Sequence, residues 1–402
     1  MIMDIKFKTT PNHKCDIKIK EQINYITNSL LEYDGIQSIV LTGGMTRGEG
    51  SAIQTKFGIE IYSDYDFIVV VDKKIFKQSK SFFQQFNIRL TQELRRDGLI
   101  PQVDVMPTTI DKLKNARPSM FFFELKETGK ILYGDDVLKL IPQFNASSIP
   151  KEDSIRTFLN RIVGHLDYID HLILDDVDLR KVKYSIYHTC VVFNGIMSSI
   201  IGLNGNYKTS YIDRYKCFKK NFPDLNMNDE LLSKVKTWVD FKLEPNINKL
   251  NNTCNMDMEG LVTLSRKNYI EAAEYTKHVW EYIIKKAYDI KSDGDVIKYT
   301  KTYFNKTDTI KYRLLFILYK IRSKKINGDL LLDLFKPAEL PSIMCCLLLC
   351  YFSIPTLLIN QRPLYIDDAI KYLNNFSDKN PKNWIETKNI ALKKWKYYVK
   401  GE

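Results

Sequence analysis

The chain has 402 residues, 44% of them hydrophobic and 27% charged, and it carries a formal net charge of +12 at pH 7. This composition is that of a soluble globular protein, and the length exceeds what one hydrophobic core usually serves, so we expect two or three domains. The seven cysteines are scattered and form no CxxC pair. That pattern argues against a disulfide framework and predicts buried free thiols in a reducing cytoplasm.

The net charge is unevenly distributed. Basic and acidic side chains nearly balance in the first 150 residues, so most of the excess of +12 lies in the remainder. A basic excess favours polyanionic partners such as nucleic acid, or anionic nucleotides. The alternative interpretation is a helical surface whose lysines are simply solvated.

The N-terminal segment, residues 1–20, lacks the apolar stretch of a signal peptide. Residues 342–360, SIMCCLLLCYFSIPTLLIN, have an uncharged core at the short limit for crossing a bilayer, and Pro355 interrupts it. We expect a buried helix that ends near Ser353. The sequence therefore predicts a cytoplasmic protein with no membrane span.

Strand and helix patterns alternate over the first 140 residues. The predicted strands are residues 36–44, 65–72 and 101–107, and the predicted helices are residues 25–33, 73–96 and 119–129. Strand patterns nearly vanish after residue 150, where the helical segments are 154–174, 180–200, 230–250, 258–290, 309–323 and 383–399. We therefore predict an α+β fold with a small sheet at residues 1–145, a helical bundle at 146–290 and a C-terminal helical region at 291–402.

The segment LTGGMTRGEG, residues 41–50, follows a buried strand with four glycines in ten residues. A glycine turn of this kind offers backbone N–H groups to a phosphate chain and lets that chain approach closely. Arg47 adds a planar, permanently charged donor suited to phosphate oxygens. By itself, a Gly-Gly turn such as Gly43–Gly44 is more often only a turn.

Three carboxylates accompany this turn. Asp64 and Asp66 lie at the edge of a predicted strand, where alternation places them on one face about 7 Å apart. Asp104 lies between two valines in another short strand, and two adjacent strands would bring all three acids together. Uncompensated negative charges at such a place are costly, and a divalent cation with oxygen ligands, Mg²⁺ or Mn²⁺, removes that cost. Each acid alone is ordinary, but their order and strand context favour a metal-bound triphosphate.

Together these residues resemble the DNA polymerase β nucleotidyltransferase superfamily. Its pattern is an apolar strand, a Gly-Gly or Gly-Ser turn, an acid-x-acid pair and a third acid in a later strand. Here the corresponding segments are IVLTGG (39–44), SDYDF (63–67) and QVDVM (102–106). Downstream, FELKETGKILYGDD (123–136) is similar to the segment that often closes the catalytic unit of bacterial nucleotidyltransferases.

The resemblance implies a mixed-sheet nucleotidyltransferase domain, followed by helical domains, that performs a two-metal nucleotidyl transfer. Asp64 and Asp66 would bind both ions, and Asp104 would complete the second metal site or act as the general base. Gly43 and Gly44, with Arg47, would hold the triphosphate.

Two features depart from the superfamily pattern. Gly44 stands where Ser is common, so Thr42, Thr46 or the backbone alone would have to contact the phosphate. Gly44 and Asp64 are also 20 positions apart, which is longer than usual, because RGEGSAIQTKFGIEIY intervenes.

The helical part contains two basic segments with interleaved tyrosines, residues 205–220 and 298–325. Such segments can follow a nucleic-acid backbone and stack on its bases. The alternative is a helix with its tyrosines in the core and its lysines in water. Lys183, in a predicted helix, is a further candidate contact to the triphosphate.

The function expected from the sequence is a metal-dependent nucleotidyltransferase that moves an NMP from an NTP onto a hydroxyl acceptor, either a small molecule or RNA, and releases pyrophosphate. The alternative is a non-catalytic module that binds nucleotide or RNA on the same fold.

Overall fold

The computed structural model describes residues 6–8, 12–98, 100–173, 178–225, 228–250, 256–310, 313–314, 317 and 338–400. The chain forms two compact units, of which the first comprises residues 1–154 and 193–257 and the second residues 155–192 and 258–402. The domains predicted at 1–145, 146–290 and 291–402 are continuous in sequence, whereas these units are not. Residues 193–257 join the unit that contains the sheet because their side chains and carbonyls bond to it, as Lys242 does with Ser51.

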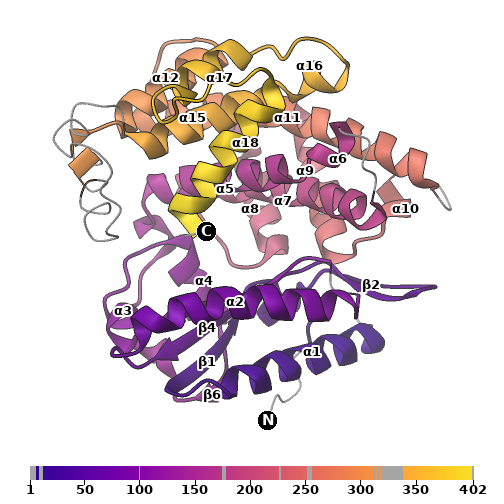
Figure 1. Ribbon diagram of the computed structural model, residues 1–402, viewed down its shortest axis with the longest axis vertical. Coiled ribbons are helices and arrows are strands. Elements are labelled where there is room, and N and C mark those ends of the chain that lie inside the picture. The colour runs from indigo at the N-terminus through magenta and orange to yellow at the C-terminus, as the bar shows by residue number, and fades with distance from the viewer. Residues whose placement is uncertain are drawn as a thin grey trace. The chain divides into compact units, whose positions relative to one another are not determined.

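A four-stranded mixed sheet forms the centre of the first unit, in the order β5-β4-β1-β6 (Figure 1). Its strands are β1 (Ile36–Thr42), β4 (Tyr65–Val71), β5 (Val103–Thr108) and β6 (Lys130–Gly134). β1 is antiparallel to β4 and β6, while β4 and β5 are parallel. A separate two-stranded sheet pairs β2 (Ala52–Thr55) with β3 (Gly58–Ile61). The three predicted strands and the α+β class with a small mixed sheet are confirmed.

Successive strand residues enter two hydrophobic cores on opposite faces of the sheet. Phe67 and Val105 belong to the core formed with α1 and α2, whereas Ile68 belongs to the core that contains Leu125 of α4. The helices concerned are α1 (His13–Leu31), α2 (Phe76–Arg95), α3 (Ile110–Lys114) and α4 (Met120–Thr128). Because both faces are covered, the strands are apolar along almost their whole length.

Helix α2 covers the open edge of β5. The Asn87 side chain accepts from the Val105 amide at 3.0 Å, and the Thr91 hydroxyl accepts from the Val103 amide at 2.9 Å. These bonds satisfy backbone groups that an edge strand otherwise exposes. The edge position also explains why β5 tolerates Pro107, which cannot donate to a neighbouring strand.

The first unit is completed by helices from residues 193–257. They are the second half of α7 (Leu179–Leu203), α8 (Tyr211–Asn221), η4 (Phe222–Leu225), α9 (Asp229–Leu243) and α10 (Ile247–Leu250). Phe193 of α7 stacks on Trp238 of α9, with ring centroids 5.9 Å apart. The aromatic contact holds these helices together within the unit.

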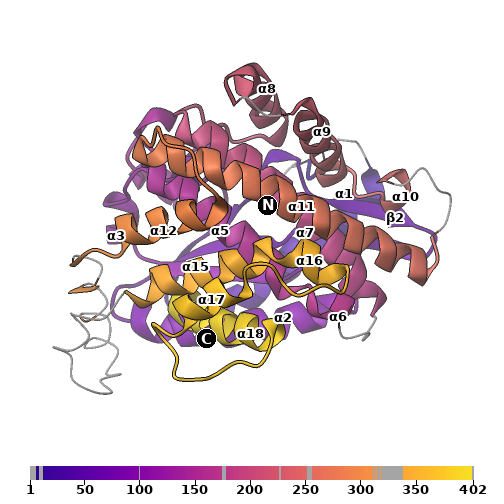
Figure 2. The same cartoon turned by 90° about the horizontal axis from the view of Figure 1, so that it is seen from above.

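The described residues of the second unit form helices joined by turns and loops, with no strand among them (Figure 2). Its elements are most of α5 (Lys151–Asp167), α6 (Asp170–Ile173), the first half of α7, α11 (Met258–Tyr288), α12 (Val296–Thr307), α15 (Glu339–Phe352), α16 (Ile354–Leu358), α17 (Ile366–Leu373), α18 (Trp384–Trp395) and η5 (Lys396–Lys400). α15 is buried and ends before Ser353, as predicted. The predicted helix at 309–323 lies largely outside the described residues.

Among the described residues, one helix is long and apolar enough to cross a membrane. It is α7, and 89% of its most apolar 18-residue window is buried inside the structure. A core helix has the same properties, so the predicted absence of a membrane span stays a prediction.

His165 is fully buried in the second unit. Its Nδ1 shares a hydrogen bond with the Tyr351 hydroxyl at 2.8 Å, its Nε2 one with the Thr189 hydroxyl at 3.2 Å, and its ring stacks on Tyr269 at 3.7 Å. Burial, with a smaller contribution from His188, lowers the pKa of His165 well below its ordinary value. The imidazole is therefore neutral in the folded chain.

This burial predicts a pH-dependent stability. An unfolded histidine binds a proton near pH 6.5, so the contribution of His165 is complete above that pH and is lost as the pH falls toward the lower folded pKa. The expected loss is about 1.4 kcal/mol per pH unit below that point. When urea unfolding is measured at several pH values, the free energy of unfolding should fall less steeply with decreasing pH for His165→Gln than for the wild type. The exposed His13→Gln serves as the control, and equal slopes for the wild type and His165→Gln would contradict the prediction.

Candidate functional site

The strand register brings two of the predicted acids side by side. Asp66 of β4 is the direct partner of Asp104 in the parallel β5, and Thr42 of β1 is the partner of Asp66 on its other side. Asp64 precedes β4 by one residue, and its Oδ1 accepts from the Gln102 amide at 3.1 Å. Asp64, Asp66 and Asp104 are each partly exposed at this end of the sheet.

The glycine bend lies directly against Asp66. Gly43 has φ 79° and ψ −159°, a conformation that is essentially confined to glycine. A Cβ atom on Gly43 would lie 2.4 Å from Oδ2 of Asp66, so the carboxylate occupies the space that a side chain would need. The Thr46 hydroxyl donates to the Gly43 carbonyl at 2.8 Å and fixes the bend from the other side. The predicted proximity of bend and acids is therefore present in the structure.

The other glycines of this segment accommodate the protein itself. A Cβ on Gly44 would lie 3.2 Å from the Glu49 carbonyl, and one on Gly50 would lie 2.7 Å from the Phe7 carbonyl and 2.6 Å from Sδ of Met45. The Gly50 amide also donates to the Phe7 carbonyl at 2.8 Å. The sequence pattern predicts that a phosphate chain requires these glycines, but Gly50 is required by the N-terminal segment of the protein itself.

The side chains do not form a metal cluster as they stand. Across the described ranges, no three His, Cys, Asp or Glu side chains lie close enough together to hold a metal ion. The backbone places Asp66 and Asp104 correctly, but Asp64 is engaged with the Gln102 amide. Asp64 thus accepts one backbone hydrogen bond through its Oδ1.

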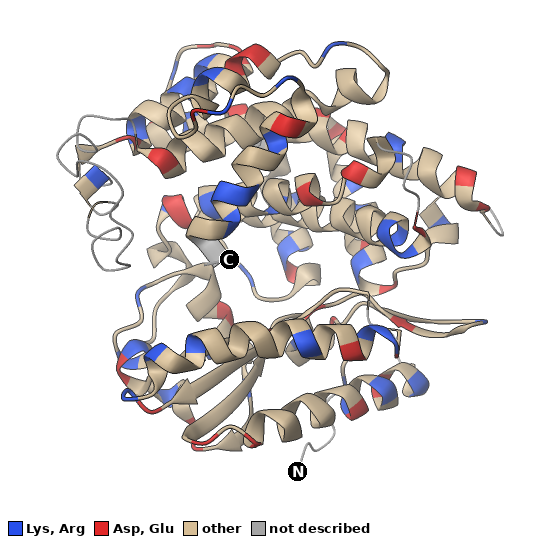
Figure 3. Ribbon diagram, in the orientation of Figure 1, with Lys and Arg blue, Asp and Glu red and all other residues tan. Residues whose placement is uncertain are grey.

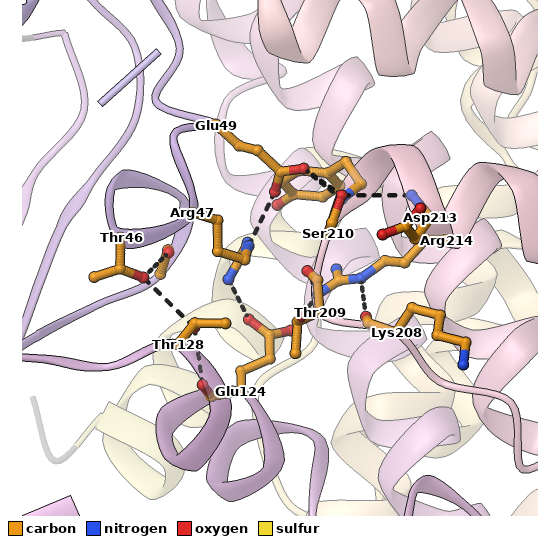
Figure 4. Close-up of polar contacts among 12 residues, drawn as sticks. Thr46, Arg47, Glu49, Glu124, Thr128, Lys208, Thr209, Ser210, Asp213 and Arg214 are labelled. Atoms are coloured by element: carbon orange, nitrogen blue, oxygen red, sulfur yellow. Dashed lines mark hydrogen bonds and ion pairs between the residues drawn. The ribbon is translucent and has the colours of Figure 1, made fainter. Parts of the chain in front are cut away.

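Arg47 does not point to the bend as a phosphate donor. Only 5% of its side chain is exposed, and it forms ion pairs with Glu49 at 2.9 Å and with Glu124 at 2.8 Å (Figure 4). Its guanidinium also lies over the Tyr211 ring at 5.5 Å. Arg47 is thus paired with two carboxylates of the protein, and its contact to a phosphate chain stays a prediction.

Glu124 of α4 receives the second guanidinium of this group. Arg214 of α8 and the Tyr207 hydroxyl both donate to its Oε1, while Arg47 donates to its Oε2. Burial alone would raise the pKa of Glu124, but the positive charges of Arg214 and Arg47 and the bonds from Tyr207 and Arg214 outweigh burial and hold that pKa below its ordinary value. Glu124 is therefore ionised in the folded chain at neutral pH.

Arg214 uses its remaining donors on neighbouring elements. It donates to the Lys208 carbonyl at 2.6 Å, the Thr209 carbonyl at 2.8 Å and the Ser198 hydroxyl at 3.2 Å. Arg214 is 4% exposed and its guanidinium lies 4.6 Å from the Tyr207 ring centroid. A buried charge of this kind is tolerated because both its charge and its N–H groups are satisfied.

Glu49 completes the group at the N-terminus of α8. Its Oε1 accepts from the Ser210 hydroxyl at 2.9 Å and from the Tyr211 amide at 2.7 Å, and it is 3% exposed. A carboxylate at this position satisfies an otherwise unpaired amide and complements the helix dipole. We call Glu49, Arg47, Glu124 and Arg214 the charge chain, since negative and positive groups alternate along it.

The sequence does not predict the charge chain. Glu124 lies in FELKETG and Arg214 among the basic residues of 205–220, and nothing in their spacing indicates that they meet. Tyr207 and Arg214 are buried, whereas Lys208, Lys216, Lys219 and Lys220 are exposed. The described part of 298–325 repeats this division, with Tyr299 and Tyr303 buried and Lys298 and Lys301 exposed.

Basic and acidic residues are interspersed along the described helices (Figure 3). Figure 3 shows Lys and Arg distributed among Asp and Glu over the helices. In segment 205–220 the lysines are exposed and Tyr207 is buried, but Tyr211 and Tyr215 are only partly buried, so both interpretations of the segment stay open. Lys183 belongs to the second unit, apart from the unit that contains the bend and the acids, so its contact to a triphosphate stays a prediction.

The chain matches none of the protein-family models, curated proteins or solved structures with which it was compared. The resemblance to the nucleotidyltransferase superfamily therefore rests on the motif residues of the sequence.

The glycine bend predicts a specific sensitivity. Gly43→Ala places a Cβ on Asp66 in a backbone conformation that disfavours it, and we expect a loss of about 2–4 kcal/mol in the free energy of unfolding. Gly58→Ala is the matched control, because Gly58 also has positive φ but no atom lies within 4 Å of the added Cβ. Chemical denaturation of both variants measures the difference. Equal losses would show that contact with Asp66 is not restrictive.

The charge chain predicts a second position that is sensitive to substitution. Glu124→Gln leaves Arg47 and Arg214 buried with one carboxylate fewer, which should destabilise the protein by about 3–5 kcal/mol. Glu127→Gln, three residues along the same helix, changes an exposed carboxylate and should cost less than about 0.5 kcal/mol. Denaturant unfolding of the two variants tests this, and a loss below about 1 kcal/mol for Glu124→Gln would contradict it.

Proposed function

We propose that this chain is a metal-dependent nucleotidyltransferase, which moves an NMP from an NTP to a hydroxyl acceptor and releases pyrophosphate. The observation that carries the proposal is the contact of the Gly43 bend with Asp66, which has Asp104 as its partner in the adjacent strand. A glycine bend at the end of a buried strand admits a phosphate chain, and the neighbouring carboxylates suit the cation that accompanies it.

The donor set fits a hard divalent cation, since three carboxylates offer oxygen ligands only. Asp66 and Asp104 would hold Mg²⁺ or Mn²⁺ from adjacent strands, and Asp64, whose Oδ1 accepts from the Gln102 amide, would join them. The cation, when bound, neutralises charge on the transferred phosphoryl group. Asp104 is the group best placed to accept the proton of the attacking hydroxyl, because it lies on the edge strand beside Asp66.

The backbone of the bend contributes the contacts to the triphosphate. A phosphate oxygen would approach the Gly43 and Gly44 amides beside the Asp66 carboxylate and the Glu49 carbonyl, which occupy the space of the missing side chains. Arg47 does not take part directly, because its guanidinium is already shared by Glu49 and Glu124. The hydroxyl of Thr46 is committed to the Gly43 carbonyl, so the bend itself replaces the Ser that is common in the superfamily.

One observation favours the non-catalytic alternative. No three-carboxylate metal cluster is formed within the described residues, and a module that only senses nucleotide or holds RNA needs none. The two functions differ in turnover, because a binding module retains NTP affinity without releasing pyrophosphate.

The deciding experiment uses the full chain with each of the four α-labelled NTPs and Mg²⁺ or Mn²⁺. Incubation with a cell extract, followed by separation into RNA, protein and metabolites, reports which acceptor becomes labelled. Transfer to RNA should weaken steeply as salt rises, whereas transfer to a small molecule should not. Nucleotide binding without label transfer or pyrophosphate release in any fraction would exclude the enzyme.

The acids give the corresponding prediction. Asp66→Asn and Asp104→Asn should each lower the rate of pyrophosphate release by about 10²-fold or more, because each removes a ligand charge from the reacting centre. Asp111→Asn serves as the control, since Asp111 follows β5 at its other end and pairs only with the exposed Lys73 among the ion pairs described. Unchanged turnover in Asp66→Asn would refute the assignment.

A further inference from the structure

The glycine bend is short, and both of its ends are fixed by different parts of the first unit. At its start, Thr42 of β1 pairs with Asp66 of β4. At its end, the 3₁₀ turn η1 (Gly44–Arg47) finishes at Arg47, whose guanidinium binds two carboxylates. The position of the bend therefore depends on where those carboxylates are held.

The charge chain carries this dependence into the helices of residues 193–257. Glu124 bonds to Arg214 and Tyr207, and Glu49 bonds to Ser210 and the Tyr211 amide at the start of α8. Arg214 in turn reaches Ser198 of α7. One continuous set of hydrogen bonds thus connects the bend with α4, α7 and α8. Figure 4 shows its part from Thr46 through Arg47 and Glu124 to Arg214.

The charge chain fixes the relative positions of its elements and carries no net charge. Its two guanidinium groups and two carboxylates cancel, and Arg47, Glu49 and Arg214 are each at most 5% exposed. Planar bonds from a guanidinium to carboxylates on separate elements define both distance and direction. A buried network with all members satisfied resists rearrangement, since breaking any bond leaves a buried charge unpaired.

We propose that Glu124, Arg214 and Ser210 are positioning residues that act through Arg47 and Glu49 to hold the Gly43–Gly44 bend in the geometry that receives the triphosphate. The proposal rests on the proposed function, because it assigns the bend to nucleotide binding. It adds that the helical segment 193–257, which lies far away in sequence, sets the affinity of that site.

The first measurement is independent of any nucleotide. Hydrogen exchange is compared between amides 43–50 and amides of α2 (76–95) in the wild type, Glu124→Gln, the milder Ser210→Ala, and the control Glu127→Gln. In Ser210→Ala, exchange at 43–50 should become about tenfold faster with α2 unchanged, whereas Glu124→Gln, which also lowers the global stability, should accelerate exchange at 43–50 more than in α2. For Ser210→Ala, equal acceleration in both segments, or no acceleration at 43–50, would overturn the proposal.

The second measurement uses MgATP, MgGTP, MgCTP and MgUTP as probes in calorimetry, and pyrophosphate release with the nucleotide that binds best. Glu124→Gln and Ser210→Ala should raise Kd and KM by about tenfold while kcat stays within about twofold, because Asp66 and Asp104 are untouched. Glu127→Gln should bind as the wild type does. If kcat instead fell by about tenfold in Glu124→Gln and Ser210→Ala while KM stayed unchanged, the positioning role would be wrong.

The two proposals fail in different ways. If the wild type binds none of the four nucleotides, the proposed function fails, and the exchange measurement still decides whether the charge chain holds the bend. If the wild type binds and turns over a nucleotide but Ser210→Ala and Glu124→Gln bind it equally well, the function stands and the positioning role is wrong.

Discussion

The parallel pairing of β4 with β5 is the constraint on which the candidate site depends. It makes Asp104 the direct neighbour of Asp66, and a shift of one residue would turn Asp104 to the opposite face of the sheet. The register is held by Phe67 and Val105, which share one core, and by the bonds from Asn87 and Thr91 of α2 to the edge of β5. Core packing and edge hydrogen bonds thus determine where the acids lie.

The second determinant is electrostatic. Four charged side chains are placed between the sheet and the helices of the first unit, where isolated charges would be strongly disfavoured. They are tolerated because the signs alternate and because Arg214 and Glu49 also bond to backbone groups and hydroxyls. The same arrangement explains the lowered pKa of Glu124 despite its burial. Net stability from such a group is small, but losing one member is expensive.

Much of the local structure could be predicted from the sequence, because it depends on residues near one another in the chain. The β-branched run at 65–72 and the apolar run at 36–44 predicted β4 and β1, and Pro355 predicted the end of α15 near Ser353. The neighbourhood of Gly43, Asp66 and Asp104 was also predicted, since strand alternation and a common strand end suffice to place them. The hydrogen bond from the Gln102 amide to Asp64 was not predicted, because it depends on the conformation of a loop.

By itself, the sequence determined the α+β class, the strands of the sheet and the acids that share one end of it, because period and turn residues act over a few positions. Only the tertiary structure decided that Arg47 pairs with Glu49 and Glu124, and that residues 193–257 belong with the sheet. In the sequence, nothing separates Arg47 and Arg214 from exposed basic residues such as the lysines near them. What distinguishes them is burial beside charged partners up to 90 residues away, and no local pattern encodes such a distance.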